Sequence, residues 1–255
     1  MKVISINVCG IRSSQKKGIF SWLAKEEADF ICMQETRALE EQIDSEDFTL
    51  KGYTRYMNVA EKKGYSGVAI YAKYEPDAID VNFSKSVFAN EGRFVSITFK
   101  DFEITSIYFP SGSSGAIRQD LKYEFMSIFE KWVKKKIKTK KKLIICGDYN
   151  IAHTKDDIKN WRSNQKNSGF LPEEREWMSK IINKIGLVDA FRKKCARTDV
   201  YTWWSNRGNA YANNVGWRID YQLVSPNLED KIKSVAVYKK EKFSDHAPLI
   251  IDYNV

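Results

Sequence analysis

Ten short apolar runs, each four to six residues long, are spread along the whole chain and constrain its fold more than any other feature. Runs of this length that are bounded by polar turns are typical of β-strands. We expect strands at residues 3–8, 30–33, 67–72, 94–99, 103–108, 143–146, 200–204, 219–224, 234–238 and 249–253. Strands separated only by turns and mixed with a few long helices favour a layered α/β fold with paired antiparallel strands.

Three other segments carry apolar residues at helical spacing. They lie within residues 15–27, within residues 121–132, and from Pro172 to a closing Gly186. Pro in the first turn and Gly after the last turn are typical helix boundaries. Because the apolar residues form stripes, we interpret these faces as core faces and not as cofactor sites.

No linker rich in Pro, Gly or Ser divides the 255 residues, and no repeat is present, so we predict a single domain of residues 1–255. The four cysteines are widely spaced without a CxxC pair, which fits reduced thiols in a cytosolic protein. There is no signal-peptide pattern, and no apolar run approaches the ~20 residues of a membrane span. We therefore expect a cytoplasmic protein without a membrane partner.

The chain is basic, with 42 Lys and Arg against 33 Asp and Glu and a pI near 9.2. Such an excess suggests a polyanionic partner, either nucleic acid or an anionic membrane. A basic surface that serves solubility explains the charge about equally well. The densest run, Lys134–Lys142, lies between a predicted helix and a predicted strand, so we interpret it as a solvated loop.

Polar side chains gather where apolar runs end, which is a common position for functional groups. They are Glu35, Asp148, Asn150, Asp220, Asp245 and His246. Alone, a Glu or Asp at such a position is usually a cap or turn residue, and a His beside Asp and before Ala-Pro can have a structural role. Together, hard oxygen ligands suit Mg²⁺ or Mn²⁺ better than zinc. Carboxylates, a base and a His are also what metal-assisted phosphoester hydrolysis requires.

The first strand raises a related question. Its period of two places Asn7 and Cys9 on the face opposite Ile4, Ile6 and Val8. A buried amide without partners costs roughly 1–3 kcal/mol. Asn7 is therefore expected to bind other polar groups, with Cys9 beside it.

The ordered series INVCGIR, MQET, IYFPSGSSG, CGDYNIAH, YTWWS, NVGWRIDY and FSDHAPL covers essentially the whole chain. It resembles the exonuclease III-type apurinic/apyrimidinic (AP) endonucleases of the endonuclease/exonuclease/phosphatase superfamily. The resemblance implies a four-layer sandwich of two packed mixed β-sheets flanked by α-helices. It also implies a Mg²⁺-dependent nuclease in which Mn²⁺ substitutes.

The resemblance implies roles for the polar residues. Glu35 would ligate Mg²⁺, with Asp245 helping to hold the ion or its waters. Asp148 would orient and deprotonate the attacking water. His246, partnered by Asp220, would stabilise charge on a phosphate oxygen.

Other residues would support them. Asn150 and Tyr108 would grip the same phosphate, and Asn7 would orient the polar cluster. Trp203, Trp217 and Ile219, with Arg218 between the last two, match a substrate pocket that accepts a flipped abasic sugar and excludes intact nucleotides.

The chain departs from the family pattern at two positions. Cys9 stands where Asn or Asp is usual, which weakens the oxygen shell around the metal. Ser111 stands where many relatives have Asn, so one phosphate contact differs. His153 follows the GDYN motif without a carboxylate partner, and we interpret it as structural.

We therefore predict a DNA repair nuclease that cuts 5′ to abasic sites and leaves a 3′-hydroxyl, with 3′-phosphatase and 3′→5′ exonuclease activity. Its partner would be double-stranded DNA with abasic sites or blocked 3′ ends, and it would act as a monomer, on the nucleoid if bacterial. One alternative is a metal-dependent phosphatase of small or lipid phosphoesters. Another is a DNA-binding protein whose nuclease site has decayed through Cys9.

Overall fold

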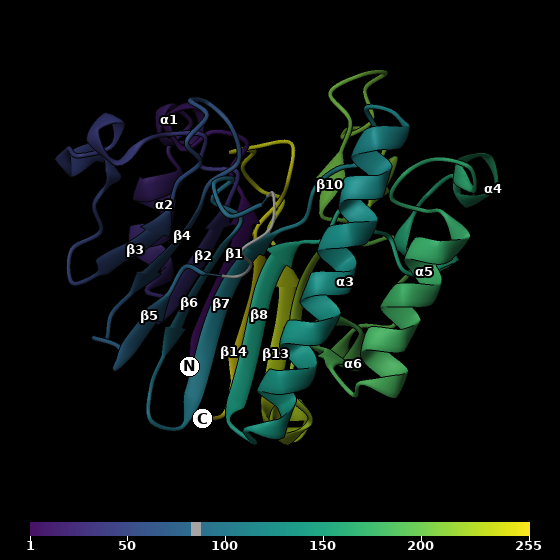
Figure 1. Cartoon of the computed structure of the whole chain (residues 1–255). Helices are drawn as coiled ribbons and strands as arrows, with labels where there is room; N and C mark the ends of the chain where they lie inside the picture. Colours follow the sequence, from purple (N-terminus) through teal and green to yellow (C-terminus); the bar gives the residue numbers. More distant parts are fainter. Residues whose placement is uncertain (83–87) are drawn as a thin grey trace.

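Two six-stranded β-sheets pack face to face, with helices on their outer faces (Figure 1). The computed structural model describes residues 1–82 and 88–255. The sheets are mixed, because β1 pairs with β2 and β7 with β8 in parallel, whereas the other pairs are antiparallel. The predicted four-layer α/β sandwich is confirmed.

The first sheet has the order β13-β14-β1-β2-β4-β3. Its strands are β1 (Lys2–Asn7), β2 (Phe30–Gln34), β3 (Thr54–Asn58), β4 (Val68–Ala72), β13 (Ile232–Val237) and β14 (Leu249–Tyr253). The second sheet has the order β5-β6-β7-β8-β12-β9. Its strands are β5 (Ala78–Asp80), β6 (Phe94–Thr98), β7 (Phe102–Tyr108), β8 (Lys142–Asp148), β9 (Val188–Asp189) and β12 (Asp220–Val224).

A small two-stranded sheet and several helices complete the described residues. The small sheet pairs β10 (Trp203–Trp204) with β11 (Gly216–Trp217). The α-helices are α1 (Ile11–Lys16), α2 (Ile19–Glu26), α3 (Ala116–Lys138), α4 (Trp161–Asn164), α5 (Pro172–Ser179) and α6 (Ala190–Lys194). The 3-10 helices are η1 (Glu40–Gln42), η2 (Glu46–Phe48), η3 (Lys155–Asp157) and η5 (Pro226–Lys231), and η4 (Lys180–Lys184) is a π-helix that continues α5.

Three apolar clusters hold the layers together. One lies between the two sheets and includes Cys32 and Cys146, both fully buried. A second packs α2 on the first sheet through Leu23, and a third packs α3 and α5 on the second sheet through Phe129 and Met178. Burial of apolar surface on both faces of each sheet stabilises the stack, at roughly 25 cal/mol per Å². All four cysteines are free thiols.

Some element boundaries differ from the prediction. The helix expected within residues 15–27 is instead two helices, because Gly18 adopts a left-handed conformation (φ 84°) between them. The expected strand at residues 200–204 is a strand only at its last two residues, and β3, β5, β9 and β11 were not predicted.

The Lys134–Lys142 run is a loop only in its middle, so its interpretation as a solvated loop was wrong at both ends. α3 continues through Lys138, and β8 begins at Lys142. Lysine is a good helix former, and positive charge is favourable near a helix C-terminus. Lys136 is also ion-paired with Glu103.

Strand directions explain why the polar residues meet. In the parallel pairs, Asn7 lies opposite Gln34, and Tyr108 lies opposite Asp148. β12 runs antiparallel to β8 and begins with Asp220 opposite Asp148. Strand ends from both sheets therefore converge at one edge of the sandwich, and the two chain termini lie at the opposite edge (Figure 1).

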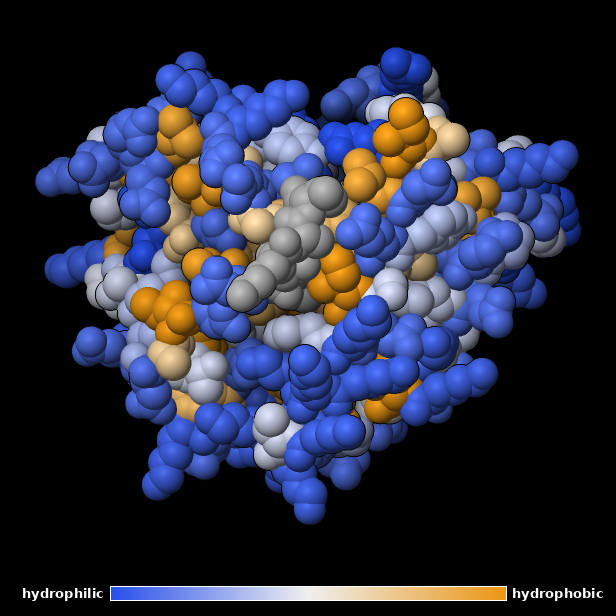
Figure 2. Space-filling view, viewed as in Figure 1, coloured by the Kyte–Doolittle hydropathy of each residue, from blue (hydrophilic) through white to orange (hydrophobic). Residues whose placement is uncertain are grey.

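Within the described part of the chain, no helix is both long and apolar enough to cross a bilayer. The face seen in Figure 2 is mostly hydrophilic, and its apolar side chains form small separate patches.

Candidate active site

A cleft of about 970 Å³ opens at the edge where the strand ends converge. Its lining includes nine of the twelve predicted site residues: Glu35, Tyr108, Asp148, Asn150, Trp203, Trp217, Ile219, Asp245 and His246. Asn7 and Asp220 lie directly behind this lining, in contact with Asp148 and His246. The remaining residue, Arg218, points elsewhere.

Asn7 links two of the carboxylates. It is fully buried, and its side-chain amide donates to Oε1 of Glu35 at 2.8 Å and to Oδ2 of Asp148 at 2.9 Å. Its Oδ1 accepts the backbone N–H of Cys9 at 2.9 Å. A buried amide with all these partners carries no desolvation penalty for unmade bonds. Asn7 therefore holds the ends of β1, β2 and β8 in register.

Asn150 holds the other side of Asp148. Its backbone N–H donates to Oδ1 of Asp148 at 2.8 Å, and its side-chain amide donates to the carbonyl of Phe109 at 3.0 Å. Asn150 leaves the extended backbone of β8, because its φ is 52°. This left-handed conformation, which Asn tolerates better than most residues, turns the backbone N–H back onto the carboxylate.

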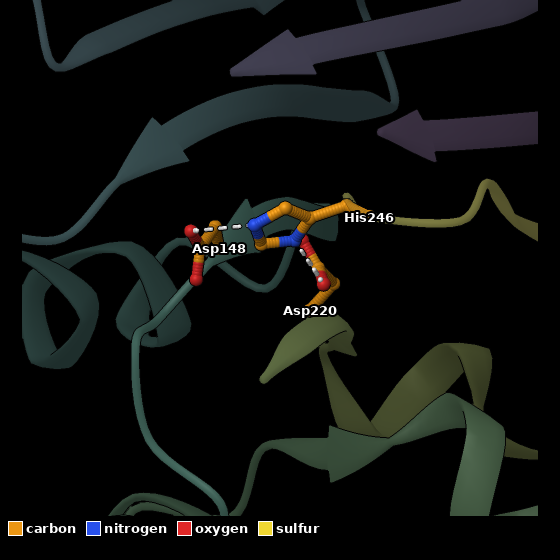
Figure 3. A group of neighbouring side chains, drawn as sticks. All are labelled: Asp148, Asp220 and His246. Carbon is orange, nitrogen blue, oxygen red and sulfur yellow. Dashed lines mark hydrogen bonds and ion pairs between the residues drawn. The ribbon is translucent and has the colours of Figure 1, made fainter. Parts of the chain in front are cut away.

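Figure 3 shows the ring of His246 between two aspartates. Nδ1 of His246 lies 2.9 Å from Oδ2 of Asp220, and Nε2 lies 3.9 Å from Oδ2 of Asp148. All three side chains are buried. Burial alone would lower the pKa of His246, but the Asp220 carboxylate, with Asp148 and Asp245, raises it to about 10. The imidazolium form is therefore favoured at neutral pH.

Asp148 is a carboxylate that is buried close to other carboxylates, which disfavours its ionised form. Burial, followed by repulsion from Asp220, raises the pKa of Asp148 to about 7, although the charge of His246 lowers it. A carboxylate with a pKa near neutrality is suited to accept a proton. Perturbation of this kind in a cleft is a mark of functional sites.

Two arrangements of ligands for a cation are available. Asp148, Asp220 and His246 offer ligand atoms within 4.8 Å of one another. Protonated His246 has no free lone pair, however, so this group fits a metal poorly. Glu35 and Asp245 both line the cleft and offer hard carboxylate oxygens, the donors that Mg²⁺ prefers. Four carboxylates converging here leave an excess of negative charge, and a divalent cation fits such a donor set.

Asp245 is anchored by its neighbours. Its Oδ2 accepts the indole N–H of Trp203 at 3.1 Å, and its Oδ1 accepts the hydroxyl of Ser244 at 3.1 Å. Burial would raise the pKa of Asp245, but the charge of His246 and these hydrogen bonds lower it overall. Asp245 therefore stays ionised and oriented toward the cleft.

Cys9 also lines the cleft, but for a different reason from the predicted one. β1 ends at Asn7, and Cys9 sits in a left-handed turn (φ 44°) and not on the strand face of Asn7. Burial, followed by the charges of Asp245 and Glu35, raises the pKa of Cys9 to about 11. The thiol is therefore neutral at physiological pH.

Because a neutral thiol is a poor Mg²⁺ ligand, we expect Cys9→Ala to change the incision rate less than about twofold. Cys9→Asp adds a hard oxygen and should lower the Mg²⁺ concentration for half-maximal rate several-fold. Mg²⁺ titrations of both variants test this, with Cys195→Ala, outside the cleft, as the control. Loss of cleavage in Cys9→Ala would show a direct role for the thiol.

The apolar wall of the cleft is formed by Trp203, Trp217 and Ile219. The rings of Trp203 and Trp217 meet edge to face with centroids 6.1 Å apart. Arg218 was wrongly placed with them. It is 1% exposed, donates to Asp157 at 2.7 Å and to Asp189 at 2.8 Å, and cannot reach a substrate in the cleft.

Two arginines that the sequence analysis did not single out contact the predicted site residues Glu35 and Tyr108. Arg37 forms an ion pair with Glu35 at the cleft, a cation two residues after the acid in the motif ETR. Arg93 stacks on the ring of Tyr108 at 4.9 Å. Burial, followed by the charges of Glu35 and Asp148, raises the pKa of Tyr108 well above its usual value, so the phenol remains a donor.

His153 and Ser111, the two other residues singled out in the sequence, lie differently with respect to the cleft. Nε2 of His153 lies 2.7 Å from the hydroxyl of Ser179, and His153 does not line the cleft. Ser111 does line the cleft, and its hydroxyl lies 2.9 Å from that of Ser113.

Comparison with known proteins agrees with this geometry. Residues 4–246 match the Endonuclease/Exonuclease/phosphatase family. The chain is 35% identical over 257 positions to an exodeoxyribonuclease of Bacillus subtilis (strain 168), covering 100% of both. It is 35% identical over 259 positions to a DNA-(apurinic or apyrimidinic site) endonuclease of Dictyostelium discoideum, covering 100% of this chain and 71% of that one.

A solved structure is also similar over its full length. An AP endonuclease from Archaeoglobus fulgidus superimposes with a TM-score of 0.91 and 26% identity, covering 100% of both chains. With this fold, this cleft and these relatives, the chain belongs to the endonuclease/exonuclease/phosphatase family and is a nuclease of the exonuclease III type.

Proposed function

We propose that this nuclease is a DNA repair enzyme that requires Mg²⁺, with Mn²⁺ as a substitute, and hydrolyses the phosphodiester 5′ to an abasic site. It leaves a 3′-hydroxyl, and it also removes 3′-phosphates and trims 3′ ends. The observation that carries the proposal is Asp148, a buried carboxylate with a raised pKa at the base of the cleft, fixed by Asn7 and Asn150 and facing a charged His246.

The proposed mechanism assigns one task to each group. Asp148 accepts a proton from the attacking water, because its pKa lies near neutrality. His246, held by Asp220, donates to a non-bridging phosphate oxygen and stabilises the charge that develops there. Tyr108 and Asn150 orient the same phosphate from the end of β7 and the turn after β8.

The metal would be held by Glu35 and Asp245, and when bound it would neutralise charge on the phosphate and leaving oxygen. Asn7 and the indole of Trp203 keep these two carboxylates oriented toward the cleft.

Two observations support DNA as the substrate. The net charge of +9 suits a polyanion. The relatives include a DNA-(apurinic or apyrimidinic site) endonuclease and an exodeoxyribonuclease, and both names specify DNA as the substrate of those proteins. For the abasic site in particular, the aromatic wall of Trp203 and Trp217 suits a sugar without a base.

We further propose that residues 1–255 act as one monomeric domain in the cytoplasm, on the nucleoid if the source is bacterial. Free thiols at all four cysteines fit a reducing compartment. Light scattering of the purified protein, alone and with DNA, tests the monomer.

The central experiment is incision of an end-labelled duplex with one abasic analogue. We expect a single cut 5′ to the analogue that requires Mg²⁺ and is abolished by EDTA. Cleavage that continues in EDTA would contradict the metal, and no cleavage of DNA would contradict the substrate.

Salt dependence separates DNA from a small or lipid phosphoester. DNA affinity should fall linearly with salt in a log–log plot, with a slope near −0.9 for each neutralised phosphate. A flat response, with hydrolysis of a small phosphoester, would favour the phosphatase alternative.

Trp217→Ala should relax the choice between abasic and intact sites. Removal of the ring widens the wall that excludes a base, so incision at an intact nucleotide should rise relative to abasic incision, by about tenfold if the lost exclusion is near 1.4 kcal/mol. The ratio of the two rates on matched duplexes measures this, with Trp132→Ala, on α3 and outside the cleft, as the control. If the ratio of intact-site to abasic-site incision were unchanged, Trp217 would have only a packing role and would not select the substrate.

A further inference from the structure

A fully buried ion pair lies behind the cleft and has no task in the mechanism above. Lys122 on α3 and Glu174 on α5 are both 0% exposed, and they form a salt bridge with each other. Burying two charges costs free energy unless further hydrogen bonds satisfy them. The further partners of this pair all belong to segments that shape the cleft.

Lys122 reaches the residue that holds the base. Its Nζ donates to the backbone carbonyl of Asn150 at 2.7 Å. The backbone N–H of Asn150 in turn donates to Asp148 at 2.8 Å. Asn150 adopts a left-handed conformation, which is unfavourable for a residue with a Cβ unless its surroundings hold it. The ammonium of Lys122 supplies such a restraint on the turn after β8.

Glu174 holds the opposite wall. Its Oε2 accepts the backbone N–H of Gly169 at 2.6 Å and that of Leu171 at 3.0 Å, and its Oε1 accepts the amide of Gln119 at 3.1 Å. The segment of residues 166–169 and Leu171 lines the cleft. A charged acceptor for two backbone N–H groups fixes this segment more firmly than a neutral one.

Gly169 shows how tightly the two walls meet. A Cβ at this position would lie 3.0 Å from the carbonyl oxygen of Asn150 and 3.0 Å from the ring of Trp217. Its φ of 95° also favours glycine. The carbonyl of Gly169 accepts the N–H of Ala152 at 2.8 Å. The segment held by Glu174 therefore abuts both the turn held by Lys122 and the apolar wall.

We infer that Lys122 and Glu174 are positioning residues of the nuclease site. As one ion pair they lock the turn at Asn150 to the segment 166–171, so that the carboxylate of Asp148 and the ring of Trp217 keep a fixed separation. This inference deepens the proposed function and rests on it for its kinetic consequence, but not for its structural one.

The test uses Lys122→Met, Glu174→Gln and a control on the same helix. Lys122→Met removes the donor to Asn150, and Glu174→Gln removes the charge while keeping an acceptor for Gly169 and Leu171. We expect kcat on the abasic duplex to fall about 10- to 100-fold, with KM changed less than threefold, because misplacement by about 1 Å has effects of this size. Val133→Ala, buried on α3 away from the cleft, should lower Tm while leaving kcat unchanged.

Hydrogen exchange supplies a readout that does not depend on the substrate. In Glu174→Gln the amides of Gly169 and Leu171 should exchange at least tenfold faster, with the amides of β8 unchanged. Equal kcat losses in Val133→Ala, or unchanged exchange at Gly169 and Leu171, would overturn the inference. If Lys122→Met does not fold, Glu174→Gln alone decides the outcome. If the wild-type protein did not cut abasic DNA, the proposed function would be refuted. The hydrogen-exchange result would still test whether Glu174 positions the segment 166–171.

Discussion

Asp148→Asn is expected to lower kcat by about 10²–10⁴-fold, the range that removal of a general base typically costs. The amide cannot take a proton from water, and its NH₂ group would face the donors of Asn7 or Asn150, which now point at carboxylate oxygens. Single-turnover incision of the abasic duplex at saturating Mg²⁺ measures the loss. Asp156→Asn, partly exposed on η3 and outside the cleft, is the matched control.

DNA binding should survive this change. Asp148 is buried at the base of the cleft, and removing its charge reduces repulsion of a phosphate. We therefore expect the Kd for the abasic duplex to be unchanged or lower. Residual activity above about a tenth of wild type would show that another group acts as the base.

The sequence predicted the site well where strand geometry determines it. The period of two in β1 correctly predicted that Asn7 turns away from Ile4 and Ile6, and the acids after apolar runs do meet. Parallel and antiparallel pairing brings these strand ends to one edge, so their meeting follows from topology. The proposed ligand roles of Glu35 and Asp245 rest on their carboxylate oxygens and on their place in the cleft.

The errors occur where the backbone leaves regular structure or where partners are distant in sequence. Cys9 and Asn150 take left-handed conformations that no spacing rule predicts. Arg218 looked available because it follows Trp217, yet its partner Asp157 is 61 residues away and buries it. Lys122 gave no signal in the sequence, because its partner Glu174 lies on another helix and 52 residues away.

His246 and Asp148 together predict a bell-shaped dependence of kcat/KM on pH. Asp148 acts as a base only when ionised, and its pKa is raised to about 7, so activity is lost as pH falls through this value. His246 stabilises the phosphate only when protonated, and its pKa is raised to about 10, so activity is lost as pH rises through that value. A divalent cation at Glu35 favours ionised Asp148 and moves the acidic limb to lower pH.

His246→Gln isolates the basic limb of this profile. Gln retains a hydrogen-bond donor but not the positive charge, so we expect kcat/KM to fall about 10²–10³-fold, as on removal of one donor to a developing oxyanion. The loss near pH 10 should disappear, because no group that titrates there remains next to the phosphate. The charge of His246 also lowers the pKa of Asp148, so its removal should shift the acidic limb upward. His153→Gln, outside the cleft, should keep both limbs, and a basic limb that persists in His246→Gln would assign it to another residue.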